Sequence, residues 1–124
     1  MYEVIVERTF AAAHALRNYQ GGCENLHGHN FRVLVRVEGH DLDQAGLLVD
    51  FLELKRAMDA VIDPYEHQNL NETAPFHELN PSAENIARWF HDRLQEAIPA
   101  RIAEVRVWET ECSSAAYRPS GGER

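Results

Sequence analysis

Residues 30–38 read NFRVLVRVE, and this stretch decides the class of fold. The odd-numbered positions from Phe31 to Val37 are all apolar, whereas most of the even-numbered positions carry a charged or polar side chain. Alternation with a period of two predicts a β-strand that has one face in the core and the other in water. A strand of this kind is typical of an antiparallel sheet.

Three further strands are predicted around this one. Residues 2–10 alternate in the same way, with Tyr2, Val4 and Val6 on one face of the strand. Residues 102–110 are predicted to form a third strand and residues 115–118 a short fourth. We expect residues 11–28, which contain two consecutive glycines, to be a loop-rich connection.

Two helices are predicted in the middle of the chain. Asp50 is a favourable N-cap residue with a glutamate three positions later, and the apolar stripe that follows it continues until Pro64. A second helix is predicted to begin near residues 80–82, an Asn-Pro-Ser segment that supplies a cap residue and a proline in the first turn. Pro99 is expected to stop this second helix.

The predicted order of elements, ββααββ, indicates an α+β fold. In such a fold, two helices cover one face of a four-stranded antiparallel sheet. We expect this single domain to span residues 1–118, and we expect residues 119–124 to be a disordered tail.

The composition excludes several classes of function. The chain has 124 residues, enough for one domain, and a net charge of −8 with a single lysine. Nucleic-acid binding requires a basic surface, and a membrane span requires about 20 consecutive apolar residues, so neither partner is expected. The N-terminus lacks the basic and apolar regions of a signal peptide, and we therefore expect a cytoplasmic protein.

The segment CENLHGHNF at residues 23–31 predicts a metal site. His27 and His29 are two residues apart at the start of a strand, so both imidazoles lie on one face. His14, at the end of the neighbouring strand, is the best candidate for a third ligand. Three histidines with one open position are typical of catalytic zinc. Two alternatives stay open: histidines without a metal, and a closed structural site with Cys23 as the fourth ligand.

Four other residues are candidates for roles in proton transfer or binding. If Cys23 does not bind the metal, a nearby divalent cation favours its thiolate and makes it a base or nucleophile. His67 follows Glu66 in the loop between the helices, where the carboxylate could orient the ring in a proton relay; a solvated loop histidine is the alternative. Glu109 could bind the edge of a guanidine-like heterocycle, or could simply be a charged strand end.

Four residues are expected to have no functional role. Cys112 is expected to be a small buried hydrophobic residue. The other three, His40, His77 and His91, are expected at the surface.

Six motifs spread over nearly the whole chain carry a resemblance to a known family. They are Phe10-x-x-x-His14, Cys23-x-x-x-His27-Gly28-His29, Asp50-Phe51-x-x-Leu54-Lys55, His67-x-x-Leu70-Asn71, Asn80-Pro81-x-x-Glu84-Asn85 and Glu109-Thr110. Together they resemble the 6-pyruvoyl-tetrahydropterin synthase family. Within it, the chain is most similar to the bacterial 6-carboxy-5,6,7,8-tetrahydropterin synthase branch, which supplies a precursor of queuosine.

The resemblance implies the tunnelling fold, in which subunits form trimers that close a barrel and two trimers stack into a homohexamer. It implies that the three histidines of the metal site bind Zn²⁺, at a site between subunits. Cys23 would be the catalytic base, with His67 in the proton relay, and Glu109 would anchor the pterin ring. The family usually has aspartate before the relay histidine where this chain has Glu66, so the relay partner is left open, and Glu109 could share the task.

The implied substrate is a pterin triphosphate, 7,8-dihydroneopterin triphosphate. In the carboxy branch, triphosphate is lost and carbon–carbon cleavage releases acetaldehyde, which leaves 6-carboxy-5,6,7,8-tetrahydropterin. The first alternative is 6-pyruvoyl-tetrahydropterin synthase, which eliminates triphosphate without cleaving the side chain. The second alternative is a non-enzymatic zinc-binding module with a closed site of one cysteine and three histidines.

Overall fold

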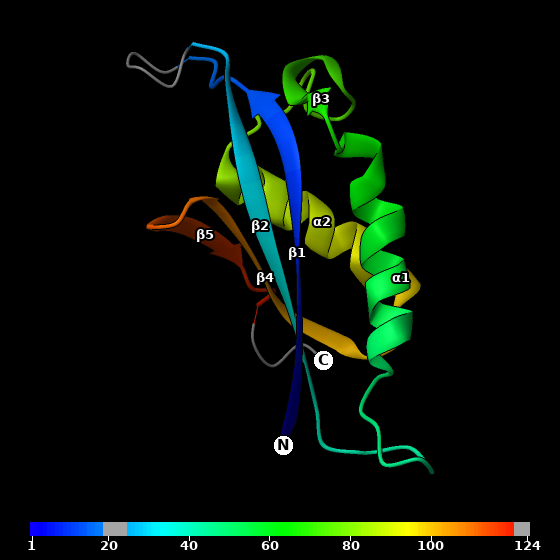
Figure 1. The fold of residues 1–124 in the computed structure, drawn as a ribbon. Coiled ribbons are helices and arrows are strands. Elements are labelled where there is room, and N and C mark those ends of the chain that lie inside the picture. Colours follow the sequence, from blue (N-terminus) through cyan, green and yellow to red (C-terminus); the bar gives the residue numbers. More distant parts are fainter. Residues whose placement is uncertain (19–24, 121–124) are drawn as a thin grey trace.

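The computed structural model describes residues 1–18 and 25–120 (Figure 1). Cys23 and residues 121–124 of the predicted tail lie outside these ranges. Within the described ranges, five strands form one sheet in the order β3-β1-β2-β4-β5. Two helices lie against this sheet, which makes the fold α+β as predicted.

The two longest strands, β1 (Tyr2–His14) and β2 (His27–Gly39), pair antiparallel along their whole length. The predicted alternation of β2 is confirmed, because every odd-numbered residue from Phe31 to Val37 is buried. The loop predicted at residues 11–28 was too long, since residues 11–14 and 27–28 are paired strand residues. Three consecutive alanines give little β-propensity, and pairing with β2 overrides it.

The sheet continues on the far side of β2 with β4 (Arg101–Thr110) and β5 (Ser113–Tyr117), both antiparallel to their neighbours. On the other side, β3 (Gln68–Asn69) pairs parallel with two alanines of β1. The sheet therefore has five strands in the described part of the chain, rather than the four predicted. A strand of two polar residues has no alternation that a sequence pattern could reveal.

The first helix, α1 (Phe51–Ile62), begins as predicted after Asp50, whose side chain accepts the Leu52 N–H at 2.9 Å. A 3-10 turn, η2 (Asp63–Tyr65), follows it and contains Pro64. A second 3-10 turn, η3 (Leu70–Glu72), comes directly after β3.

Arg8 of β1 ties the C-terminal end of α1 to the sheet. Its Nη1 donates to Oδ1 of Asp59 and to Oδ1 of Asp63, both at 2.7 Å. The last turn of α1 contains no basic residue. The positive charge that favours the carbonyl end of a helix therefore comes from the neighbouring strand.

The second helix, α2 (Ala83–Ala97), has Ser82 as its N-cap, with the Ser82 hydroxyl accepting the Asn85 N–H at 3.1 Å. Pro81 precedes this cap, so it lies just before the helix and not in the first turn where it was predicted. The helix ends two residues before Pro99, as expected.

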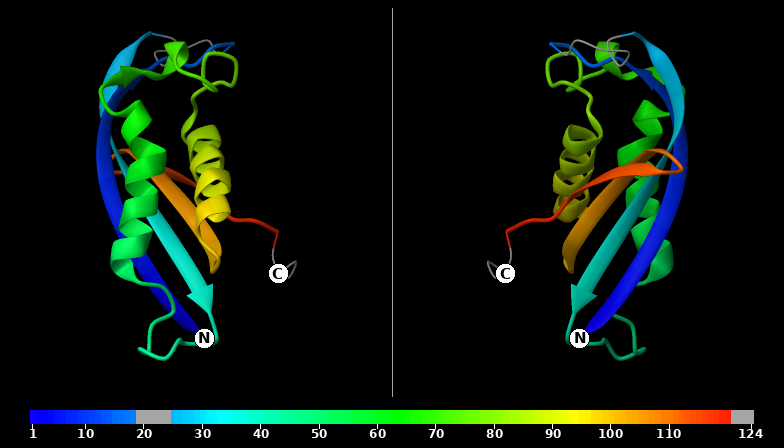
Figure 2. Two further views of the ribbon diagram at one scale, coloured as in Figure 1. Left: turned by 90° about the vertical axis from the view of Figure 1, so that its right-hand side faces the viewer. Right: turned by 90° about the vertical axis from the view of Figure 1, so that its left-hand side faces the viewer.

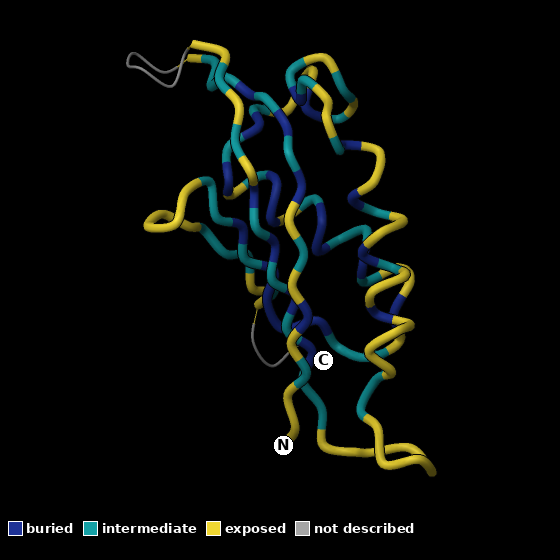
Figure 3. Tube along the Cα trace, viewed as in Figure 1, coloured by how far each residue is buried: buried dark blue, intermediate teal, exposed yellow. Residues whose placement is uncertain are grey.

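Both helices cover the same face of the sheet, α1 near β1 and α2 across β4 and β5 (Figure 2). Buried residues alternate with more exposed ones along the strands, and the exposed residues of α1 lie on the side of the helix away from the sheet (Figure 3). Phe10 of β1 and Phe31 of β2 stack in this core with ring centroids 5.0 Å apart. The end of the sheet beyond these two rings is where the polar cluster described below begins.

No helix in residues 1–18 and 25–120 combines the length and apolar character needed to cross a membrane.

Candidate metal centre

Three histidines meet at one end of the sheet, on the face that the helices cover. His14 ends β1 and lies opposite His27 at the start of β2, while His29 lies opposite Ala12. The His14 ring centroid is 4.7 Å from that of His27 and 5.3 Å from that of His29. The period-two pattern that buries Phe10 and Phe31 therefore also brings these imidazoles together.

Glu109, near the end of β4, joins the three histidines. Its Oε1 lies 3.2 Å from Nε2 of His14 and 3.3 Å from Nε2 of His29. The preceding Trp108 points to the opposite face of the sheet, where the Arg32 guanidinium lies 3.7 Å from its ring centroid. Side chains alternate along a strand, so Glu109 turns toward the histidines.

Two backbone carbonyls set the tautomers of the cluster. Nδ1 of His14 lies 2.7 Å from the Pro81 carbonyl oxygen, and Nδ1 of His27 lies 2.6 Å from the carbonyl oxygen of Asn25. A carbonyl can only accept, so Nδ1 carries the proton in both rings. In the neutral rings, Nε2 keeps its lone pair free for a ligand, which is the usual arrangement of metal-binding histidines.

His29 contributes a nitrogen without a hydrogen-bond partner. Its Nε2 is buried and has no hydrogen bond, although the Glu109 carboxylate is close. Burial lowers the pKa of His29, and the nearby His27 and His14 lower it further, whereas Glu109 raises it. A buried polar atom left without a partner costs about 1–3 kcal/mol, so this nitrogen suits a site that a ligand completes.

The donor set fits zinc. One ligand atom from each histidine and from Glu109 lies within 4.8 Å of the others, the one such group in the described residues. Three imidazole nitrogens that leave a fourth position open are a usual donor set of catalytic zinc. The Glu109 carboxylate lies next to them, 3.2 and 3.3 Å from Nε2 of His14 and of His29.

The structure places His67 away from this cluster. Its side chain is 80% exposed, its φ is +60°, and its Nε2 lies 4.0 Å from Oε2 of Glu66. The Glu66 carboxylate has two closer partners: Oε2 accepts the Ala11 N–H at 2.6 Å and Oε1 accepts from Arg8 at 3.2 Å. Glu66 therefore holds the loop to the edge of β1, next to the histidine.

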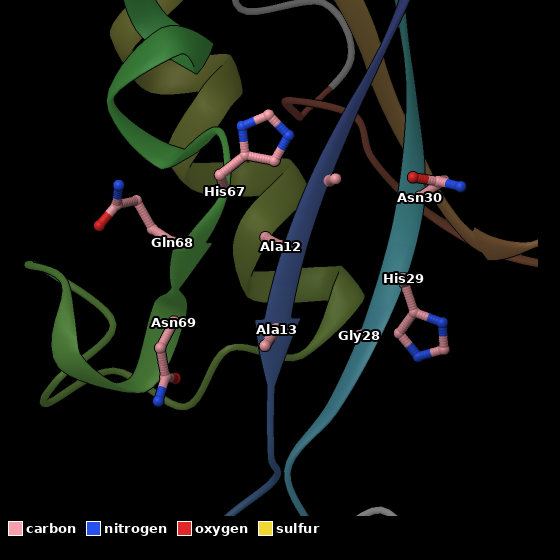
Figure 4. A pocket seen from close by; sticks show the side chains of 9 residues that line it. Ala12, Ala13, Gly28, His29, Asn30, His67, Gln68 and Asn69 are labelled. Carbon is pink, nitrogen blue, oxygen red and sulfur yellow. The ribbon is translucent and has the colours of Figure 1, made fainter.

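His67 lines a pocket of about 520 Å³ at the edge of the sheet (Figure 4). Alanines 11–13, Gly28 and Asn30 form its floor, and residues 67–69 form one wall. The ring of His29, which also belongs to this pocket, points away from His67 (Figure 4). Within the described part of one chain, the metal cluster and His67, the expected relay histidine, therefore do not form a single site.

Sequence reasoning missed one carboxylate near the cluster. Glu84, taken only as part of a helix-start motif, lines a pocket of about 150 Å³ together with Glu109, Ser113 and Ser114. The sequence predicts where α2 begins, and therefore that Glu84 lies in its first turn. The approach of Glu84 to Glu109 at the end of β4 depends on how the helix packs against the sheet, which the sequence does not reveal.

Two residues without a predicted role differ from expectation. Cys112 is exposed in the turn between β4 and β5, and is not a buried hydrophobic residue. His91, expected at the surface, is buried between Asp92 and the Ile102 carbonyl oxygen, with contacts of 3.0 and 3.1 Å. A histidine on the core stripe of a helix becomes buried when a strand packs over it.

Comparisons with known proteins give matches over most of the chain. The family model described as 6-pyruvoyl tetrahydropterin synthase matches residues 3–120. A dihydroneopterin monophosphate aldolase of Pyrococcus furiosus is 36% identical, over 86% of this chain and 88% of its own. A 6-carboxy-5,6,7,8-tetrahydropterin synthase of Haemophilus influenzae is 31% identical, over 95% and 99%. The structure of Caenorhabditis elegans 6-pyruvoyl tetrahydropterin synthase is similar with a TM-score of 0.84 and 29% identity, covering 97% and 98%.

Proposed function

The chain belongs to the 6-pyruvoyl tetrahydropterin synthase family, and we propose that it is a zinc-dependent lyase that forms 6-carboxy-5,6,7,8-tetrahydropterin. The observation that carries this proposal is the convergence of three imidazoles, two of them with tautomers set by backbone carbonyls, next to a carboxylate. The substrate is 7,8-dihydroneopterin triphosphate. One water is consumed, and acetaldehyde and triphosphate are released in a step toward a queuosine precursor.

His14, His27 and His29 would hold the zinc ion through their Nε2 atoms. Zinc, when bound, acts as a Lewis acid that makes the hydroxyl protons of the substrate side chain more acidic. The Glu109 carboxylate would anchor the pterin ring through paired hydrogen bonds to its guanidine-like edge. The small pocket that Glu109 shares with Glu84 supports this, because it gives Glu109 a second carboxylate as a neighbour.

Cys23 and His67 would transfer protons. Cys23 lies four residues before His27 in the sequence, and we assign it the role of catalytic base. His67 would complete the relay. Because its ring is exposed, the substrate that it contacts would lie at the surface of the chain to which His67 belongs. Glu66 stays a possible relay partner, 4.0 Å from the ring.

A site between subunits would combine these groups. The sheet has two edges where a further strand could pair. On the outer edge of β1, β3 pairs only with residues 12 and 13, and β5 is the edge strand on the other side of the sheet. Exposed strand edges readily pair with other chains. We therefore propose that subunits join edge to edge in a homohexamer, made of two trimers, in which His67 of one copy approaches the metal cluster of another.

Product identification tests the reaction. Zinc-loaded protein is incubated with 7,8-dihydroneopterin triphosphate, and the pterin product and the volatile product are analysed by mass spectrometry. We expect 6-carboxy-5,6,7,8-tetrahydropterin and acetaldehyde, and no turnover in protein stripped of metal by a chelator. A pyruvoyl product without acetaldehyde would instead identify the chain as a 6-pyruvoyl tetrahydropterin synthase. The similarity to the C. elegans enzyme of that name supports this alternative.

A second candidate function comes from the relative in P. furiosus. An aldolase acting on dihydroneopterin monophosphate would leave a hydroxymethyl group on the pterin. Supplying the monophosphate and the triphosphate separately distinguishes the two reactions. Turnover of the monophosphate to a hydroxymethyl pterin, with no turnover of the triphosphate, would favour the aldolase.

A non-enzymatic zinc module is tested with Cys23→Ala. If Cys23 is the catalytic base, the Cys23→Ala variant should still bind zinc but should have no turnover. Loss of zinc from this variant would favour the closed site of one cysteine and three histidines.

A further inference from the structure

Where the chain continues beyond His14 at the end of β1, two asparagine side chains make the backbone hydrogen bonds that a neighbouring strand would otherwise make. The two residues of β3 pair only with Ala12 and Ala13. Beyond them, the backbone of Ala15 exchanges two hydrogen bonds with the side chain of Asn71: the Ala15 N–H donates to Oδ1 and Nδ2 donates to the Ala15 carbonyl, both at 2.8 Å.

Asn80 repeats this arrangement two residues further on. The Arg17 N–H donates to Oδ1 of Asn80 at 2.9 Å, and Nδ2 of Asn80 donates to the Arg17 carbonyl at 3.0 Å. In an antiparallel pair, alternate residues exchange both backbone bonds with the opposite strand. The carboxamides of Asn71 and Asn80 therefore mimic peptide groups and continue the edge that β3 begins.

Asn80 also fixes the loop that orients His14. Its own carbonyl accepts the Ser82 N–H and the Asn85 side-chain amide, both at 2.9 Å. Between Asn80 and Ser82 lies Pro81, whose carbonyl accepts from Nδ1 of His14 at 2.7 Å. The backbone that follows His14 and the carbonyl that holds its ring are thus joined through one side chain.

The placement of His14 depends on such external support. It is the last residue of β1, and its side chain is only 1% exposed. A metal ligand must be held to within about half an ångström to keep its geometry, and a strand terminus on its own frays. The hydrogen bonds of the two asparagines lie immediately after His14, where fraying would begin.

We propose that Asn71 and Asn80 are positioning residues of the metal centre. This inference rests on the proposed function, in which His14 binds zinc. The two carboxamides hold the backbone of Ala15 and Arg17 in place, and Asn80 holds the Pro81 carbonyl against Nδ1 of His14, so that Nε2 points to the ion. This assigns a role to two motif positions, Leu70-Asn71 and Asn80-Pro81, that the reaction does not use.

Metal affinity tests the proposal without reference to turnover. The apo forms of the wild type, Asn71→Ala and Asn80→Ala are titrated with zinc in competition with a chromophoric chelator, well below their unfolding temperatures. We expect both variants to bind zinc about 10- to 100-fold more weakly, as happens when partners of metal-binding histidines are lost. Asn80→Ala should be the weaker binder. The absorption spectrum of the Co²⁺ forms should change as well, because the geometry around the ion changes.

Two control variants separate positioning from general stability. Gln44→Ala removes an exposed carboxamide far from the site, and Val35→Ala opens a cavity in the fully buried core. We expect Val35→Ala to lower the unfolding temperature and both controls to keep the zinc affinity of the wild type. If the alanine variants do not fold, the isosteric Asn80→Asp, which keeps the acceptor and loses the donor, is titrated in their place. The same weaker zinc binding is then expected.

The outcomes distinguish this inference from the proposed function. Folded asparagine variants that bind zinc like the wild type would overturn the positioning role and leave the zinc site intact. A wild type that binds neither zinc nor cobalt would overturn both.

Discussion

Oε1 of Glu109 lies 3.2 Å from Nε2 of His14, although the two residues are 95 positions apart in the chain. The contact joins the end of β4 to the end of β1 across β2, which lies between them. It places a carboxylate where both a metal and a substrate ring could be reached.

Glu109→Gln should separate substrate binding from metal binding. The amide keeps the size of the side chain and loses the charge that would hold the guanidine-like edge of the pterin. Hydrogen bonds to charged groups contribute about 1.5–3 kcal/mol, so we expect kcat/KM to fall by about 10- to 100-fold. Zinc content, measured by atomic absorption, should stay near that of the wild type. A variant that loses zinc with unchanged substrate affinity would make Glu109 a metal ligand only.

His27→Gln should remove the metal. Its ring lies 4.6 Å from that of His29 between centroids, and no other described residue is placed to replace it in the cluster. We expect loss of bound zinc after dialysis and loss of turnover. The matched control is His40→Gln, an exposed histidine outside the cluster, which should keep both. Full zinc content in His27→Gln would contradict the proposed ligand set.

Variants at position 67 should show that stability and activity depend on different properties of the residue. His67 has a φ of +60°, a left-handed conformation that costs L-residues about 1–2 kcal/mol and that β-branched residues adopt least readily. We expect His67→Val to lower the free energy of unfolding by about 1 kcal/mol. We expect His67→Gly to leave it nearly unchanged, because the strain that glycine relieves is offset by its greater freedom in the unfolded chain. Urea titration measures both. Both variants should lose turnover and retain zinc, whereas a catalytically active His67→Gly would remove the histidine from the proton relay.

Stability should decrease in acid partly because of Glu104. Burial opposes its ionisation, but hydrogen bonds from Arg118 and Arg106 dominate and lower the pKa of Glu104 below its ordinary value. The unfolded state therefore takes up the proton at a higher pH than the folded state does. The stabilisation is complete above the ordinary pKa of this glutamate, 4.5, and is lost as the pH falls through the lower folded value.

Glu104→Gln should accordingly be less stable than the wild type at pH 7, and its free energy of unfolding should depend less on pH below about 5. Urea titrations between pH 3 and pH 7 measure this difference. The exposed Glu111→Gln serves as the control and should follow the wild type. Parallel curves for Glu104→Gln and the wild type would show that the arginines do not favour the ionised carboxylate.

Local patterns predicted most of the fold. Alternation in β2 and the caps at Asp50 and Ser82 are set by neighbouring residues, so the sequence reveals them directly. The same parity predicted that His27 and His29 share a face. These features depend on contacts within a few residues, which is the range over which a sequence pattern carries information.

The remaining features depend on contacts between distant segments. β3 exists because Gln68 and Asn69 reach the edge of β1, and no property of these residues alone predicts a strand. The approach of Glu109 to the histidines follows from the register of β4 against β2. His91 is buried because β4 and β5 pack beside its helix. Pairing registers and packing of this kind have no local signature.

The contact of Arg8 with Asp59 and Asp63 bears on the order in which the chain folds. A helix of 12 residues is marginal on its own in water, and α1 has acidic side chains near the end where its dipole disfavours them. The compensating guanidinium belongs to β1, more than 40 positions upstream. We therefore expect α1 to be unstructured as an isolated peptide and to form only as the hairpin of β1 and β2 assembles, so that strand pairing comes before helix formation in this half of the molecule.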